Sequence, residues 1–451
     1  MLWQQFKQKS GRRVVITGMG TLTPLGNTLQ ANFDGLLAGK TGITKIPKER
    51  FPEIDEMPVK IGGLLNEDLE KWYKIMPSNR TSQNAFGFIG AYKAMEDSGY
   101  KPKTAEEHER FGVIMGTGTS TGRNIFETAE EHERFGVIMG TGTSTGRNIF
   151  GIYDKFFRAN NSFDVVHGGY IEETDIHGIT NAVSRYFKTK GPVGTITAAC
   201  ATGQAVIQEA YRNIVLNEAD VMIAGSAENV VIPYGLRGFA TLGAINVKDN
   251  DNPEGAARPM DESRMGLVAS DGGNGVVCEE LQHALKRGAR IYGEVLGYSM
   301  NCDGYHLTRP TASGEGIFRT MKNSIEMAGL QPKDLTIVHA HAAGTREGDI
   351  AEMIAIDRLF GENRPYVTGC KGNTGHMMCT IGTYHCIESL LSIYYGKIPA
   401  IRNLKNPIQV NGKLLNYVRE TVECDVNYVV MNNVGFGGIN SSLVVGKYKN
   451  N

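Results

Sequence analysis

Two kinds of hydrophobic pattern alternate along the chain. Short, nearly continuous apolar runs are typical of strands that are buried on both faces, whereas apolar residues that recur every three to four positions are typical of amphipathic helices. The strand-like runs are residues 14–17, 112–115, 221–224, 275–278, 291–295, 336–339, 428–431 and 442–445. The helix-like segments are residues 87–97, 205–216, 317–328, 348–360 and 387–395. This alternation predicts an α/β fold with a parallel or mixed sheet.

The chain also shows a weak internal similarity. A strand that leads into a glycine-rich turn occurs at residues 13–20 and again at residues 290–297. A chain of 451 residues, 41% of them hydrophobic, can bury a large core, and two halves of similar kind are a reasonable expectation. Periodicity and length alone set no boundary between such halves.

One segment is duplicated without change: residues 104–126 recur at 128–150. Repeat architectures need at least three units, and their copies drift, so two identical copies do not indicate a solenoid. The segment predicts an acidic helix end, a strand and a loop rich in glycine and threonine. We interpret it as a duplication in the recorded or expressed sequence rather than a natural insertion. One copy is expected to occupy the sheet and the other to bulge outward or pack poorly.

Composition restricts the classes of partner and the compartment. The formal net charge is −1, so no overall field attracts nucleic acid or an anionic membrane. Seven cysteines without a regular framework indicate free thiols in a reducing compartment. The first residues lack the apolar core of a signal peptide, and no stretch of about 18 apolar residues is present. These features predict a cytoplasmic protein.

The strongest candidate for chemistry is Cys200. It ends the β-rich run of residues 193–200 and opens a helical stretch that begins at Ala201. A thiol at a strand-to-helix turn lies near free backbone N–H groups and the positive end of the helix dipole, which favour the thiolate. The alternative is a buried structural cysteine, which is the commoner role of a free cysteine. We predict that Cys200 is an ionised nucleophile.

Further candidates follow in glycine-rich settings. His341 lies in Val-His-Ala-His-Ala-Ala-Gly-Thr, and His376 lies five residues after Lys371 in Lys-Gly-Asn-Thr-Gly-His. The block Asn-Val-Gly-Phe-Gly-Gly around Phe436 follows a β-rich run, and its glycines allow close backbone approach. Either histidine could instead be a core residue with satisfied hydrogen bonds, which is the role expected for His339.

The order and spacing of these motifs resemble the β-ketoacyl carrier-protein synthases, the elongating condensing enzymes of fatty acid and type II polyketide synthesis. The resemblance covers nearly the whole chain, from residues 13–26 to residues 435–444, with residues 219–226, 257–261 and 303–310 between them. It implies the thiolase-like fold, in which two βαβ-rich halves pack as five αβαβα layers. The N-terminal half would comprise residues 1–287 and carry Cys200, and the C-terminal half would comprise residues 288–451 and carry the two histidines and the Gly-Phe-Gly-Gly loop. It also implies an acyl carrier protein that brings phosphopantetheine, no bound cofactor or metal, and a dimer with itself or with a related subunit.

The resemblance assigns a role to each candidate residue. Cys200 would accept the acyl group, His341 and His376 would donate N–H groups to the malonyl thioester during loss of CO2, and Lys371 would organise His376. The backbone N–H groups of Cys200 and Phe436 would form the oxyanion hole, with Phe436 as a gate. Further substrate-binding residues implied by the resemblance are Thr308, Thr345, Gly435 and Gly437.

Several departures from the family pattern concern the substrate. Ala343 stands where the family has a threonine that meets the pantetheine, and Asp271 replaces a glutamate. Thr119 or Thr143 takes the place of a large aliphatic residue in the acyl pocket. This polar lining suggests an acyl group other than a plain saturated chain.

Another departure from the family pattern concerns the partner of Lys371. The acidic residue that usually pairs with it falls at His385, so Lys371 lacks its expected partner unless Glu388, one helical turn further on, reaches it. A zinc interpretation of Cys370, His376, Cys379, His385 and Cys386 does not fit the usual CxxC or HxxxH spacing of structural sites.

The favoured function is a decarboxylative Claisen condensation of acyl and malonyl thioesters, in a polyketide or specialised fatty acid pathway. An acyltransferase or cyclase that uses the same acyl-cysteine without malonyl elongation is the alternative. A chain-length partner subunit is a third possibility, against which the presence of Cys200 speaks. Lys71, Lys74 and Arg80 form a basic cluster that would meet an acidic carrier protein or would only be a solvated face.

Overall fold

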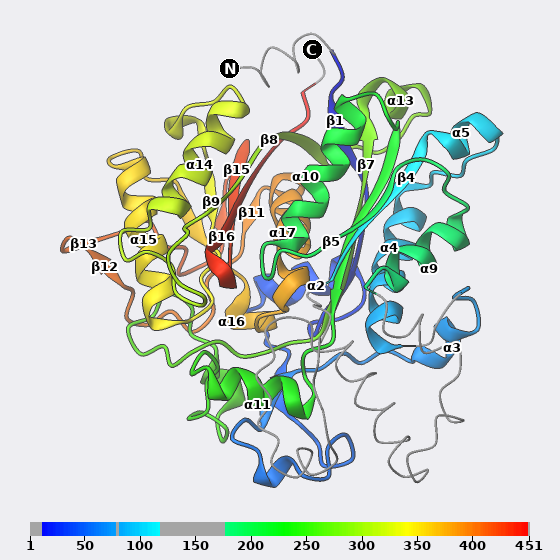
Figure 1. Cartoon of the computed structure of the whole chain (residues 1–451). Helices are drawn as coiled ribbons and strands as arrows, with labels where there is room; N and C mark the ends of the chain where they lie inside the picture. Colours follow the sequence, from blue (N-terminus) through cyan, green and yellow to red (C-terminus); the bar gives the residue numbers. More distant parts are fainter. Residues whose placement is uncertain (1–10, 78–80, 118–175, 450–451) are drawn as a thin grey trace.

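The computed structural model describes residues 11–77, 81–117 and 176–449. Within these residues a mixed sheet of ten strands runs through the molecule in the order β10-β9-β15-β16-β8-β1-β7-β6-β4-β5 (Figure 1). The strands of the first half are β1 (Val14–Leu22), β4 (Phe111–Thr117), β5 (Val193–Ile196), β6 (Val221–Glu228) and β7 (Gly272–Glu280). Those of the second half are β8 (Gly293–Cys302), β9 (Ile337–His339), β10 (Tyr366–Thr368), β15 (Tyr428–Gly435) and β16 (Ile439–Gly446).

The two halves have the same topology. In the first, β4 pairs in parallel with β5 and β6, and β7 pairs antiparallel with β6 and β1. In the second, β9 pairs in parallel with β10 and β15, and β16 pairs antiparallel with β15 and β8. The halves join where β1 runs antiparallel to β8, with Val14 opposite Val295. The division at residues 287 and 288 stays a prediction, and it falls between α13 (Leu281–Lys286) and β8.

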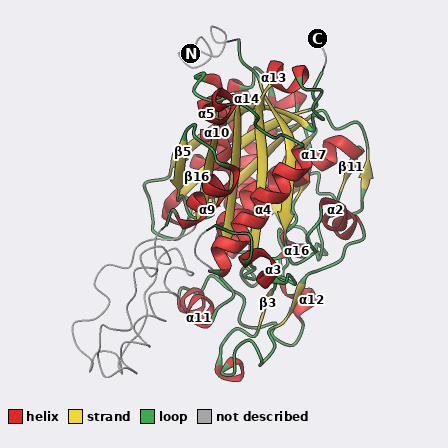
Figure 2. Ribbon diagram, turned by 90° about the vertical axis from the view of Figure 1, so that its right-hand side faces the viewer, coloured by secondary structure: helices red, strands yellow, loops and turns green. Residues whose placement is uncertain are grey.

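Each half of the sheet forms one layer, and helices lie between the two halves and on both outer sides, which gives five layers (Figures 1 and 2). Helices α4 (Ser82–Ser98) and α9 (Gly178–Phe187) cover the outer face of the first half. Helices α10 (Thr202–Val215) and α17 (Ile381–Tyr395) pack against each other between the halves, and α14 (Glu315–Met327) and α15 (Arg346–Phe360) lie on the outer side of the second half. The layers confirm the predicted thiolase-like α/β fold.

The central layer explains why its helices are so apolar. Helix α17 is buried from Ile381 to Ile393, and its Ile387 and Leu390 share one core with Ile207 and Ile214 of α10. Because both sides of this layer face a sheet, polar residues on α17 have no route to water and must find partners inside. Two such polar residues of α17 are His385 and Glu388.

All eight predicted strands are confirmed, although β8 begins two residues later than the predicted run and β10 was not anticipated because it is only three residues long. The first copy of the duplicated segment supplies α5 (Ala105–Glu109) and β4, so one copy does occupy the sheet. The second copy lies outside the described residues. Within the part of the chain that is described, no helix combines the length and the apolar character needed to cross a membrane.

Candidate active site

Cys200 lies in a tight turn between β5 and α10. The turn is closed by the Thr202 hydroxyl, which accepts from the Ala198 N–H and donates to the Ala199 carbonyl, both at 2.7 Å. Ala199 has a φ of 48°, in the left-handed region that residues with a Cβ avoid. The turn therefore holds Cys200 two residues before the first helical residue, as the sequence predicted.

The Cys200 thiol is protonated in the resting protein, contrary to the predicted ionised state. The backbone N–H groups of Cys200 and Phe436 and the charge of Lys371 all favour the thiolate, but burial outweighs them and raises the pKa of Cys200 to about 12. The prediction considered only the local helix terminus and could not include desolvation by the second half. Both N–H groups face the sulfur, and their role as an oxyanion hole stays a prediction.

Two histidines of the second half line the same pocket as Cys200. His341 follows β9 and His376 follows α16 (Lys371–Thr374), and their ring centroids lie 5.2 Å apart with the planes at 78°. Burial lowers the pKa of each well below the ordinary value, and the nearby lysine lowers both further. Both rings are therefore neutral at physiological pH and can donate an N–H without adding charge.

The tautomer of His376 follows from its neighbours. Its Nδ1 accepts the N–H of Met378 at 3.1 Å, so the proton of the neutral ring is on Nε2. Met378 has a φ of 43° and Ala342, next to His341, has a φ of 37°. Residues with a left-handed backbone conformation, Ala199, Ala342 and Met378, thus lie close to Cys200, His341 and His376. Such clustering is typical of functional sites.

Glu352 of α15 is a site residue that the sequence analysis missed. Its two carboxylate oxygens accept the N–H groups of His341 and Ala342, each at 2.7 Å, and one of them also accepts from Asn432 at 3.2 Å. Burial raises its pKa, and the two backbone N–H groups oppose that rise. Glu352 lies three residues after Asp349, which accepts from Gly344 at 3.0 Å, so the start of α15 fixes the His341 loop.

Lys371 is fully buried behind the histidines. Its ammonium donates to the His341 carbonyl and lies 3.4 Å from Nε2 of His385, and burial lowers its pKa. Glu388 does not pair with it: a Glu388 oxygen lies 2.9 Å from Nε2 of His339 instead. Among the described residues, Lys371 therefore contacts a backbone carbonyl and an imidazole and no carboxylate. His339 is buried as predicted, and its Nδ1 has no hydrogen-bond partner in the described part of the chain.

The glycine-rich block forms another wall of the pocket. At Gly435 an added Cβ would lie 3.2 Å from the Cys200 nitrogen, so glycine permits the close approach of the two backbones. The Phe436 ring lies in the pocket wall, 6.1 Å from the ring of Phe239. Gly437 turns the chain at a φ of 83° and donates its N–H to Leu307 at 2.6 Å.

The remaining predicted residues divide into three groups. Thr308, Thr345 and Ala343 line the pocket, as expected for substrate contacts. Gly437 lies next to the pocket rather than on its wall, and Asp271 pairs with Arg50 at 2.8 Å.

Apolar residues make up much of the rest of the wall: Val230, Tyr234, Phe239, Leu242, Leu267, Met378 and Val434. Glu228, a buried acid that the sequence analysis missed, also lines it. Thr119, Thr143 and Arg80 lie outside the described residues, and Lys71 pairs with Glu67.

Two matched halves that enclose the Cys200 thiol and two neutral histidines define a condensing enzyme of the thiolase-like class. The N-terminal domain model of the beta-ketoacyl synthases matches residues 11–284, and the C-terminal domain model matches residues 292–405. The chain belongs to the β-ketoacyl synthase family, as its motifs predicted.

Relatives of this family match over nearly their full length. The chain is 35% identical over 441 residues to a 3-oxoacyl-[acyl-carrier-protein] synthase 2 of Coxiella burnetii, covering 97% of this chain and 99% of the relative. It is 33% identical over 441 residues to the protein of the same name from Vibrio cholerae, covering 96% and 99%. A solved β-ketoacyl synthase from Burkholderia phymatum superposes with a TM-score of 0.82 at 28% identity, covering 97% of this chain and all of that one.

Proposed function

We propose that the chain is a β-ketoacyl carrier-protein synthase that joins an acyl group held on Cys200 to a malonyl thioester with loss of CO2. The observation that carries the proposal is the convergence, in one pocket, of the Cys200 thiol, two neutral imidazoles and two backbone N–H groups. Membership of the β-ketoacyl synthase family supports it.

In the first step the Cys200 sulfur attacks the carbonyl carbon of an acyl thioester. The new sulfur–carbon bond forms as the bond to the carrier sulfur breaks, and the Cys200 proton leaves with the carrier thiol. Because the thiol is neutral at rest, deprotonation accompanies attack rather than preceding it. The N–H groups of Cys200 and Phe436 hold the oxyanion of this step.

In the second step a malonyl thioester loses CO2. The enolate oxygen that forms receives N–H donors from His341 and His376, and neutral rings are suited to this because they do not protonate the carbanion. The carbanion attacks the acyl-cysteine carbonyl, and the same backbone N–H groups hold the second oxyanion. Breaking the carbon–sulfur bond releases the β-ketoacyl thioester, and Cys200 regains a proton.

The partners and the pathway are part of the proposal. Acyl and malonyl groups would arrive on the phosphopantetheine arm of an acyl carrier protein, with Thr308 and Thr345 at the pocket wall as contacts for that arm. A polyketide or specialised fatty acid pathway fits the loss of a hydroxyl at Ala343. A dimer and a cytoplasmic location remain predictions.

Incubation of the purified chain with acyl and malonyl carrier proteins tests the function. We expect a β-ketoacyl product, released CO2 and an acylated Cys200 in the intact mass spectrum. Cys200→Ala should remove acylation, and Cys386→Ala is the matched control because that thiol is buried away from the pocket. Acylation of Cys200 without CO2 release would contradict condensation and favour the acyltransferase alternative.

A further inference from the structure

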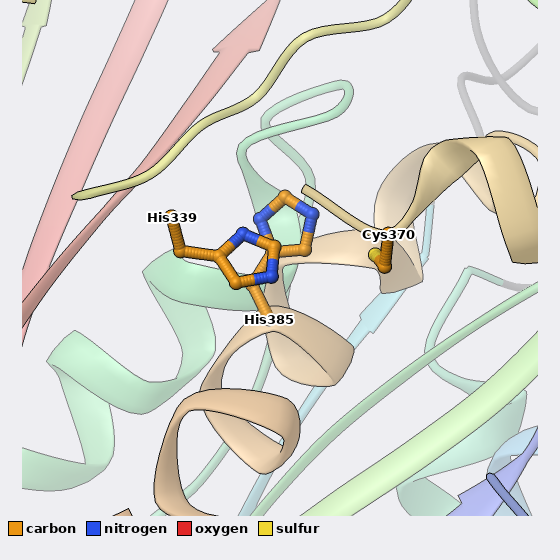
Figure 3. Close-up of side chains that lie close together, drawn as sticks. All are labelled: His339, Cys370 and His385. Carbon is orange, nitrogen blue, oxygen red and sulfur yellow. The ribbon is translucent and has the colours of Figure 1, made fainter. Parts of the chain in front are cut away.

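A second cluster of ligand-type side chains lies behind the active site. His339 ends β9, Cys370 precedes α16 and His385 is on α17, and one potential ligand atom from each lies within 4.8 Å of the others (Figure 3). Figure 3 shows the two imidazole rings side by side, with the sulfur of Cys370 directed toward them. Their ring centroids are 4.1 Å apart.

A carboxylate completes the set. Glu388 lies one helical turn after His385 on α17, and one of its oxygens is 2.9 Å from Nε2 of His339. The Glu388 carboxylate also reaches the Cys370 thiol. Two imidazoles and a thiol therefore lie within 4.8 Å of one another, and the Glu388 carboxylate borders this cluster through its contacts with His339 and Cys370.

These groups are buried and poorly satisfied by one another. His339, Cys370, His385 and Glu388 are each 1% exposed or less. Nε2 of His339 faces the Glu388 oxygen at 2.9 Å, whereas Nδ1 of His339 and Nδ1 of His385 have no hydrogen-bond partner among the described residues. Buried polar atoms without partners cost free energy, so two such imidazole nitrogens in one cluster indicate that a further partner belongs there.

We propose that His339, Cys370, His385 and Glu388 form a structural site for a divalent transition metal, with zinc as the best match. Nitrogen and thiolate ligands suit zinc rather than magnesium or calcium. Tetrahedral zinc with these ligand types separates the ligand atoms by about 3.3–3.6 Å, so metal binding would draw the three atoms, now within 4.8 Å of one another, closer together and turn the Glu388 carboxylate toward them. Four protein ligands leave no open position, so the site is structural.

The charge of the assembled site is balanced. A divalent cation and its ligands, a thiolate, a carboxylate and two neutral imidazoles, sum to zero, and Lys371 is the neighbouring basic group, 3.4 Å from Nε2 of His385. On binding, the sulfur–hydrogen bond of Cys370 is replaced by a sulfur–metal bond and one proton is released. No electron is transferred.

The position of the site suggests what it does. Cys370 is the neighbour of Lys371, and His339 lies two residues before His341 on the same segment. A metal would tie the end of β9, the start of α16 and helix α17 to one another at the place where the family's acidic partner of the lysine is replaced by His385. Because the ligands come from separate elements, the CxxC or HxxxH spacing that is typical of structural zinc sites does not identify them.

Metal analysis of the intact protein tests the proposal. The full chain is produced in zinc-supplemented medium, purified without chelator and analysed by inductively coupled plasma mass spectrometry. We expect about one zinc per chain. Cys370→Ser and His385→Gln should each weaken zinc retention against a competing chelator at least tenfold, because loss of even an outer-shell partner costs that much. Cys386→Ser, next to His385 but outside the cluster, should retain the metal.

A second measurement decides the matter if the variants do not fold. The wild-type chain grown with cobalt should show the sulfur-to-cobalt charge-transfer band and the visible bands of a tetrahedral thiolate site. The proposal is overturned if the wild-type protein holds less than about a tenth of an equivalent of metal after both growths. It is also overturned if Cys370→Ser and His385→Gln retain the metal as well as the wild type does. Neither readout depends on condensing activity, so failure of the proposed function would be seen separately.

Discussion

Glu352→Gln isolates the carboxylate that holds the His341 loop. In the structure each carboxylate oxygen accepts one backbone N–H, from His341 and Ala342, at 2.7 Å. Glutamine keeps one accepting oxygen but turns an NH2 group toward the other N–H. The change therefore removes one charge-assisted hydrogen bond, worth about 1.5–3 kcal/mol, and leaves a buried N–H unpaired at a further cost of about 1–3 kcal/mol.

The loop can relieve this cost of about 2.5–6 kcal/mol only by moving His341. A displacement of about 1 Å at a reacting group lowers the rate by about a hundredfold. We expect malonyl decarboxylation by Glu352→Gln to fall by about that factor, whereas acylation of Cys200, which does not use His341, changes little. Decarboxylation is followed by CO2 release and acylation by intact mass spectrometry.

Glu347→Gln is the matched control because Glu347 is exposed in the first turn of the same helix. It should behave as the wild type in both assays. The reasoning fails if Glu352→Gln decarboxylates malonyl thioesters at the wild-type rate with an unchanged melting temperature. Equal losses in both steps would also contradict it, because the loop would then support Cys200 as well.

Two further predictions concern pH. Because burial raises the pKa of Cys200 to about 12, its alkylation by iodoacetamide should keep rising with pH beyond pH 9, and a plateau near pH 7 would show an ionised resting thiol. Because burial keeps the pKa values of His341 and His376 well below 6.5, both rings stay neutral as the pH falls from 8 to 6.5, and the decarboxylation rate should stay level over that interval. A loss of rate with a midpoint at pH 6.5 or above, at saturating substrate and with Cys200 acylation intact, would contradict neutral donors.

The elements and the main reactive residues could be predicted because their signals are local or depend on order along the chain. Buried strands read as apolar runs, and Cys200 stands at the turn where a run ends and a helix begins. The meeting of Cys200, His341 and His376 was predicted through the family resemblance and not through spacing, since the thiol and the rings come from different halves.

What could not be predicted depends on tertiary neighbours. The raised pKa of Cys200 comes from desolvation within the assembled pocket, which no local pattern reports. Glu352 looked like an ordinary residue of an amphipathic helix, and only the folded loop brings two backbone N–H groups to it. Glu388 contacts His339 rather than Lys371. The spacing of residues along α17 could not indicate this contact, because His339 lies on a different element, β9.

The junction between β1 and β8 has a consequence for engineering. Only residues 14–16 of β1 pair with β8, yet this short ladder joins the half that supplies the thiol to the half that supplies both imidazoles. A chimera that exchanged one half for that of a relative would inherit the nucleophile and the imidazole hydrogen-bond donors from different parents. Its turnover would report how faithfully the graft preserved their mutual alignment.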